Sequence, residues 1–139
     1  MTSRLNPYLT FRDRAREAMT FYQTVFGGTL EISTFAEFHA SDDPAEHNNV
    51  MHSTLTTDSG FVLMGADVPR TMELSEGSSI SVSLSGDDNA ELTGYWNALM
   101  DGGTVGEQLS KAPWGDSFGM GVDRFGVTWL VNISGAQAS

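Results

Sequence analysis

The chain has 139 residues, of which 40% are hydrophobic and 18% charged, a composition and length that fit one globular domain with a substantial core. Acidic residues outnumber basic ones by 18 to 7, and the formal net charge of −11 disfavours nucleic acid and anionic membrane surfaces as partners. No cysteine is present, which excludes disulfides, thiolate metal ligands and a cysteine nucleophile.

The first half of the chain starts with a strand pattern and continues with a helix pattern. Apolar and polar residues alternate over residues 5–11, which predicts a strand. Helical spacing follows over residues 15–26, with Asp13 as the expected N-terminal cap and Gly27-Gly28 as the C-terminal cap. The remaining predicted elements are a strand over 29–38, a polar loop over 39–49, and a hairpin with strands over 50–57 and 61–67.

The second half repeats this order. Residues 79–85 alternate serine with Ile80, Val82 and Leu84, which predicts a strand whose apolar side packs on a helix. Residues Gly86-Asp87-Asp88-Asn89 then supply caps for a helix predicted over 90–100. A strand over 104–108, a loop over 110–114, and a hairpin with strands over 116–123 and 127–133 follow. Gly27-Gly28 matches Gly102-Gly103, and the polar loop of the first half accounts for its greater length.

Internal repetition therefore predicts one α+β domain over residues 1–139, built from two βαβββ modules in tandem at residues 4–67 and 79–133. Each module is expected to form a mixed sheet with its helix on one face and an open concave cleft on the other. The serine side of residues 79–85 then faces either solvent or that cleft.

The order and spacing of several stretches resemble the vicinal oxygen chelate superfamily, which includes glyoxalase I, extradiol dioxygenases and bleomycin-resistance proteins. Six features are similar to its PhnB-like branch, often labelled 3-demethylubiquinone methyltransferase-like. They are NPYLTF, AMTFYQTVFGG, the histidine of VMHSTL, MGAD, WGDSFG and DRFGVTWLVN. The resemblance covers about residues 4–133. It implies a homodimer in which each cleft is built from paired modules.

The resemblance also implies where a metal would lie. Enzymes of the superfamily usually hold a divalent ion with His, Gln or Glu on the first and last strands of each module. The matching positions here are Asn6 or Tyr8, Met64 or a neighbour, Ser81, and Leu130 or a neighbour. None of them supplies the imidazole or carboxylate that such an ion needs, so we expect no cofactor and no metal at these positions.

A second group of possible metal ligands is His39, His47 and His52, with Glu37 and Glu46 nearby in the sequence. This composition is compatible with zinc. The first two histidines, however, fall in a loop rich in Ser, Asp and Asn, where solvated side chains are the simpler interpretation.

His52 is the leading candidate for a functional residue. It lies in the middle of a predicted strand, on the same side as Thr54 and Thr56, and the PhnB-like branch carries a histidine there. A neutral imidazole can act as a general base or as a hydrogen-bond anchor. The structural alternative is a partly buried histidine bonded to a side chain of a neighbouring strand.

Trp114 is expected to lie over the cleft and stack on a ligand, whereas Trp96 and Trp129 follow helix and strand periods and are expected in the core. The predicted ligand-binding residues are Asn6, Tyr8, His52, Met64, Ser81, Ser83 and Trp114.

No nucleotide-binding motif supports the methyltransferase label. No Gly-x-Gly-x-x-Gly sequence opens a helix after a strand. Gly119-Met120-Gly121 falls inside a predicted strand, where glycine is typical of a bulge or a close backbone approach.

Our leading hypothesis is a small-molecule-binding protein without the usual metal, acting as a homodimer with no nucleic-acid or membrane partner. No apolar run has the length of a membrane span or a signal-peptide core, so we expect a cytoplasmic protein. One alternative is a metal-dependent lyase or dioxygenase with non-standard ligands around His52 and Glu37. The other is a metal-free enzyme with His52 as the base and Tyr8 or a serine holding the developing charge.

Overall fold

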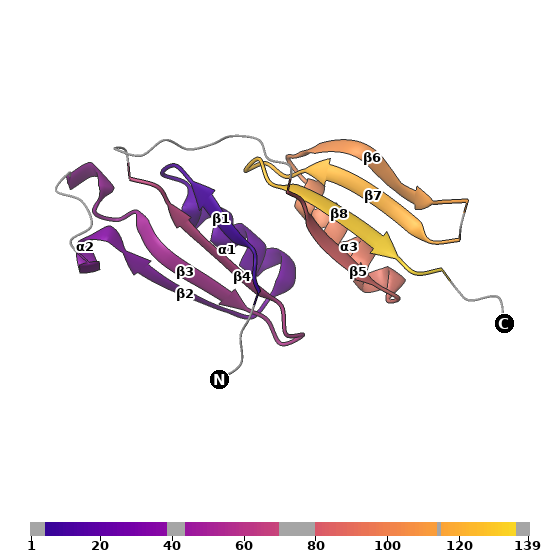
Figure 1. Ribbon diagram of the computed structural model, residues 1–139, viewed down its shortest axis with the longest axis horizontal. Coiled ribbons are helices and arrows are strands. Elements are labelled where there is room, and N and C mark those ends of the chain that lie inside the picture. Colours follow the sequence, from indigo (N-terminus) through magenta and orange to yellow (C-terminus); the bar gives the residue numbers. More distant parts are fainter. Residues whose placement is uncertain (1–4, 39–43, 70–79, 114, 136–139) are drawn as a thin grey trace. The chain divides into compact units, whose positions relative to one another are not determined.

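The computed structural model describes residues 5–38, 44–69, 80–113 and 115–135, and the chain divides into two compact units, Met1–Ser75 and Glu76–Ser139. Each unit is a four-stranded mixed sheet with a 12-residue helix (Figure 1). This is the pair of βαβββ modules that the internal repeat predicts.

The first unit has the strand order β1-β4-β3-β2, in which β1 runs parallel to β4 and the other neighbours are antiparallel. Helix α1 packs against β2, β3 and β4. The elements are β1 (Tyr8–Phe11), α1 (Ala15–Phe26), β2 (Thr29–Thr34), α2 (Phe35–Phe38), the 3-10 helix η1 (Pro44–Glu46), β3 (Val50–Thr56) and β4 (Val62–Asp67).

The predicted strand over residues 29–38 is wrong at its end. The register of β2 against β3 shifts between Ser33 and Thr34, and the chain then turns into α2. The N–H of Phe35 donates to the carbonyl of Asn49 at 2.9 Å, and the side chain of Phe35 is buried. The burial of this phenylalanine accompanies a helical turn that strand periodicity did not predict.

The prediction that Asp13 caps α1 is also wrong. Asp13 has a positive φ of 61°, and its Oδ1 accepts a hydrogen bond from Asn49 Nδ2 at 2.6 Å. The cap comes instead from Asp67 at the end of β4, whose Oδ1 accepts the backbone N–H groups of Arg14 and Ala15, each at 2.9 Å. A carboxylate at the start of a helix satisfies N–H groups that have no partner within the helix.

The second unit has the strand order β5-β8-β7-β6, with β5 parallel to β8 and the other neighbours antiparallel. Its elements are β5 (Val82–Gly86), α3 (Asn89–Met100), β6 (Thr104–Lys111), β7 (Ser117–Val122) and β8 (Thr128–Ile133). Asp88 caps α3 as its sequence position suggests, because its Oδ1 accepts the N–H of Glu91 at 3.0 Å.

Two predicted boundaries in this unit are wrong. The first strand begins at Val82, so Ile80 and Ser81 precede it, and Ile80 is 75% exposed instead of packing on the helix. Leu84 is buried, as predicted. Strand β6 extends to Lys111 and so includes residues expected in a loop.

The two hairpin turns repeat one arrangement of hydrogen bonds. In the first, the N–H of Phe61 donates to Thr57 Oγ1 at 3.0 Å, and Gly60 has a φ of 93°. In the second, the N–H of Val127 donates to Asp123 Oδ1 at 3.1 Å, and the matching glycine has a φ of 90°. A residue with a side-chain acceptor opens each turn, and a glycine at positive φ closes it.

The aromatic core of the second unit agrees with the sequence periods. Trp96 and Trp129 are both buried, as predicted. The indole Nε1 of Trp129 donates to Asp123 Oδ2 at 2.9 Å, so the turn carboxylate also satisfies the polar atom of the core tryptophan. An added Cβ at Gly121 would lie 2.9 Å from the backbone carbonyl oxygen of Thr104 in β6 and would also meet the side chain of Met100 in α3. The predicted close backbone approach at this glycine is therefore confirmed.

Candidate functional site

One face of the first sheet carries polar side chains. Ser53 and Leu55 of β3 are buried, and the alternation of the strand places His52, Thr54 and Thr56 on the opposite face. We call this the polar face of the first sheet. The strand register aligns one row of residues across all four strands: Tyr8, Met64, Thr54 and Glu31.

His52 lies beside this row and is held at both ring nitrogens. Its Nδ1 is 3.3 Å from the phenol oxygen of Tyr8, and its Nε2 is 3.2 Å from Oγ1 of Thr54. The phenol and imidazole rings have centroids 5.8 Å apart and are tilted by 31°. The structure therefore brings together a phenol, an imidazole and a hydroxyl in one hydrogen-bonded series.

The contact between Tyr8 and His52 spans a strand. Tyr8 belongs to β1 and His52 to β3, and β4 lies between them in the sheet. Beyond Met64, the next β4 residue on this face is Ala66, which pairs with Thr10. The side chain of β4 at that position is therefore a single methyl group.

Two arrangements of protons satisfy this series. In one, the phenol O–H donates to Nδ1 and Nε2–H donates to Thr54; in the other, both bonds run in the opposite direction. Partial burial raises the pKa of Tyr8 above its ordinary value of 10.0, so the phenol keeps its proton at neutral pH. In either arrangement both imidazole nitrogens are engaged, and the phenol and the Thr54 hydroxyl are the groups left with capacity to bind a ligand.

The other predicted ligand-binding residues have different positions. Met64 lies in the aligned row, between Tyr8 and Thr54. Asn6 precedes β1 and is half-buried. In the second unit, Ser81 lies just before β5 and Ser83 lies in β5, and both are exposed. Trp114 lies outside the described residues.

The donor set does not fit the superfamily's divalent metal. The side chains at the matching positions are those of Asn6 or Tyr8, Met64, Ser81 and Leu130, which offer no imidazole and no carboxylate. Within residues 5–38, 44–69, 80–113 and 115–135, no group of three His, Cys, Asp or Glu side chains is arranged to hold a metal ion. Of the alternative cluster, His39 lies outside the described residues, and Glu37 and His47 are exposed.

Thr54 and Glu31 belong to the site but are not among the residues predicted from the sequence. The alternation along residues 50–57 places Thr54 on the same side as His52, which is a usable signal. Glu31 was expected on a strand, but its pairing with Thr54 depends on the register of β2 against β3.

Comparisons with known proteins identify the family. The sequence model of the 3-demethylubiquinone-9 3-methyltransferase family matches residues 3–132, and the chain belongs to this family. The structure of protein PA1353 from Pseudomonas aeruginosa is 38% identical, with a TM-score of 0.81, over 96% of this chain and 98% of that one. The PhnB protein from Bacillus cereus is 20% identical, with a TM-score of 0.74, over 95% of this chain and 100% of that one.

The fold extends to the wider superfamily. A glyoxylase/bleomycin resistance protein/dioxygenase domain from Frankia sp. EAN1pec has a TM-score of 0.63 and 14% identity, over 100% of this chain and 96% of that domain. The resemblance to the PhnB-like branch of the vicinal oxygen chelate superfamily is therefore confirmed. Among the helices of the described residues, none is long and apolar enough to cross a membrane.

Proposed function

We propose that this protein binds a small organic molecule on the polar face of the first sheet, through the phenol of Tyr8 and the hydroxyl of Thr54, with His52 holding both in place. One observation carries the proposal: both ring nitrogens of His52 are within hydrogen-bond distance of these two hydroxyl groups. A half-exposed side chain on a sheet face needs no such double restraint for packing. The restraint orients two polar groups toward whatever lies on that face.

The hydrogen-bond chemistry defines the class of ligand. With a neutral imidazole, the series presents one outward donor and one outward acceptor, at the phenol and the threonine hydroxyl in either order. The matching ligand carries both an acceptor and a donor. Met64, between Tyr8 and Thr54 in the aligned row, adds an adaptable apolar contact for the part of the ligand between its polar groups.

The charges of this face favour an uncharged or cationic ligand. Glu31 lies at one end of the aligned row, and the row contains no lysine or arginine. The whole chain carries a formal net charge of −11, which repels anions. Phosphorylated molecules and dicarboxylates are therefore poor candidates.

A metal-free enzyme with His52 as general base is the second candidate function. The observation that favours it is the distance of 3.3 Å between Nδ1 and the phenol oxygen of Tyr8, the group expected to hold the developing charge beside the base. Both ring nitrogens are engaged by Tyr8 and Thr54, however, so His52 must give up one of these hydrogen bonds before it can take a proton from a ligand. We therefore prefer a binding role, in which His52 is a positioning residue.

A screen of uncharged fragments by ligand-observed NMR tests the proposal. For fragments that bind the wild type, Tyr8→Phe and Thr54→Val should each weaken binding by about 1 kcal/mol, because each removes one hydroxyl and keeps the shape of the side chain. Thr56→Val is the matched control, because Thr56 is an exposed threonine on the same strand and face. Its affinity should equal that of the wild type.

His52→Gln separates positioning from direct contact. If His52 positions the two hydroxyl groups, the combined variant His52→Gln with Tyr8→Phe should lose little more affinity than either single change. Additive losses would mean that the imidazole contacts the ligand itself. Unchanged fragment affinity in Tyr8→Phe, Thr54→Val and His52→Gln would contradict the proposal.

A further inference from the structure

Protonation of His52 changes the hydrogen-bond character of the polar face of the first sheet. A neutral imidazole donates at one nitrogen and accepts at the other, whereas an imidazolium donates at both. Both partners of the ring are hydroxyl groups, Tyr8 Oη at 3.3 Å from Nδ1 and Thr54 Oγ1 at 3.2 Å from Nε2. A hydroxyl group can donate or accept, so both contacts persist after protonation once the hydroxyl hydrogen that pointed at the ring has rotated away.

This rotation changes what the face offers to a ligand. Beside a neutral imidazole, one of the two hydroxyl groups donates outward and the other accepts. Beside an imidazolium, both hydroxyl groups accept from the ring, so both O–H bonds are left to donate outward. Partial burial raises the pKa of Tyr8, so the phenol still carries a proton to donate. The protonated face therefore presents two donors next to a positive charge.

The charged and titratable groups around His52 leave the imidazole as the group that responds near neutral pH. On this face β1 contributes Tyr8, β2 contributes Glu31, and β4 contributes apolar side chains. Arg12, which follows β1, donates to the carbonyl of Pro69, and Glu37 of α2, the helix that contacts β3, is exposed. Among these side-chain types, imidazole is the one that changes its charge between about pH 5 and 8.

We infer that protonation of His52 converts this face from a site for an amide-like group into a site for a carboxylate. An amide has one acceptor and one donor side, which match the neutral series. An ionised carboxylate only accepts, which matches two outward donors, and its charge is attracted by the imidazolium. Beside a neutral imidazole the same carboxylate would meet an outward lone pair and the negative charge of Glu31. The inference rests on the proposed function and adds the proton that selects between two classes of ligand.

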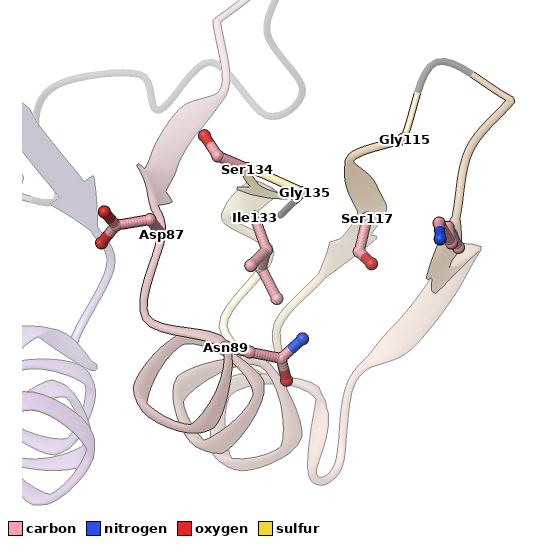
Figure 2. A pocket seen from close by; sticks show the side chains of 8 residues that line it. Asp87, Asn89, Gly115, Ser117, Ile133, Ser134 and Gly135 are labelled. Atoms are coloured by element: carbon pink, nitrogen blue, oxygen red, sulfur yellow. The ribbon is translucent and has the colours of Figure 1, made fainter. Parts of the chain in front are cut away.

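The second unit offers a competing place for a carboxylate. A hollow of about 710 Å³ at one end of its sheet is lined by Lys111, Asn89 and Ser117, among others (Figure 2). Figure 2 shows the carboxylate of Asp87 directed away from this hollow, so an anion bound there would not meet it. An ammonium group does not titrate between about pH 5 and 8. Carboxylate binding in the hollow would therefore lack the pH dependence that we expect beside His52.

Benzamide and benzoate are matched probes, because they share one shape and differ in the amide and the carboxylate. Their affinities for the full chain are measured by ligand-observed NMR at about pH 8 and about pH 5.5, where benzoate stays ionised. The affinity of benzoate relative to benzamide should rise about fivefold as the pH falls, the equivalent of one hydrogen bond. His52→Gln should give a ratio that does not change with pH. His47→Gln, at an exposed histidine of the same unit, is the control and should behave like the wild type.

The outcomes separate this inference from the proposed function. A constant ratio in the wild type, with benzamide binding still weakened by Tyr8→Phe and Thr54→Val, would overturn the inference and leave the proposed function intact. A ratio that still changes with pH in His52→Gln would also overturn it, as would benzoate binding that Lys111→Met abolishes. Absence of binding by both probes at both pH values would count against the proposed function and this inference together.

Discussion

Asp67 and Val50 join two strands through a buried hydrogen bond: the carboxylate oxygen Oδ2 of Asp67 accepts the N–H of Val50 at 2.9 Å. The other oxygen of the same carboxylate caps α1 at Ala15. Asp67 is only 5% exposed, so one carboxylate connects the end of β4, the start of β3 and the start of α1. This connection holds in place the strand that carries His52.

Substitution of Asp67 should destabilise the protein. Asp67→Asn replaces one acceptor oxygen with an N–H donor, which leaves a buried N–H without a partner at a cost of about 1–3 kcal/mol. Asp67→Ala removes both oxygens and should cost more. Urea denaturation measures both changes, and Asp58→Asn, in an exposed turn, should change stability by less than about 0.5 kcal/mol. A wild-type midpoint for Asp67→Ala would contradict this assignment.

Asp123→Asn should have a comparable effect in the second unit. The carboxylate accepts the N–H groups of Phe125 and Val127 and the indole N–H of Trp129, and it is 4% exposed. An asparagine cannot accept at both oxygen positions, so we expect a loss of about 1–3 kcal/mol and a change in Trp129 fluorescence. Trp129→Phe combined with Asp123→Asn should show non-additive losses, because the two residues share one hydrogen bond.

The ionisation of Tyr8 should be visible in an alkaline titration of phenolate absorbance. The pKa of Tyr8 is raised above 10.0 by burial, so the difference between the wild type and Tyr8→Phe should have its midpoint above pH 10. The stability linked to this group is fully present below the unfolded pKa and is lost as pH rises through the higher folded pKa. Burial also raises the pKa of Tyr95, and the negative charges of Glu91 and Asp88 raise this pKa further. The same titration of Tyr95→Phe therefore separates the signal of Tyr95 from that of Tyr8. A midpoint at or below 10.0 for Tyr8 would refute the prediction.

The metal content of the purified protein tests whether the side chains at the matching positions bind a divalent ion. The side chains at the matching positions, Asn6 or Tyr8, Met64, Ser81 and Leu130, supply no imidazole or carboxylate. Protein purified without chelators should therefore contain far less than one zinc, nickel, iron or manganese ion per chain. Elemental analysis of the wild type and of His52→Ala provides the measurement. One metal per wild-type chain, lost in the variant, would favour a metal-dependent enzyme around His52.

The protein is expected to form a homodimer in solution. Each sheet leaves two strands at its edges, and Met51, Ile80 and Met120 are exposed apolar side chains, so we expect a homodimer that covers part of this surface. Light scattering should report about 30 kDa, twice the mass of the 15.0 kDa chain, as for the twofold assemblies that are commonest among soluble proteins. A single species at the chain mass across micromolar concentrations would exclude it.

The sequence by itself determined the features that depend on neighbouring residues. Strand and helix periods, the glycines that end α1 and close both hairpin turns, and the side of β3 that carries His52 all arise within a few residues of chain. The Asp88 cap and the burial of Trp96 and Trp129 follow from the same local patterns. The duplicated module was readable because these patterns occur twice in the same order.

The tertiary structure decided the contacts between residues far apart in the chain. Asp13 stands next to α1, yet Asp67 caps it, because the strand order brings the end of β4 to the start of the helix. Tyr8 and His52 are 44 residues apart, and they meet because β1 and β3 both pair with β4. Such contacts depend on strand order and register, which many distant residues fix together and which no local pattern specifies.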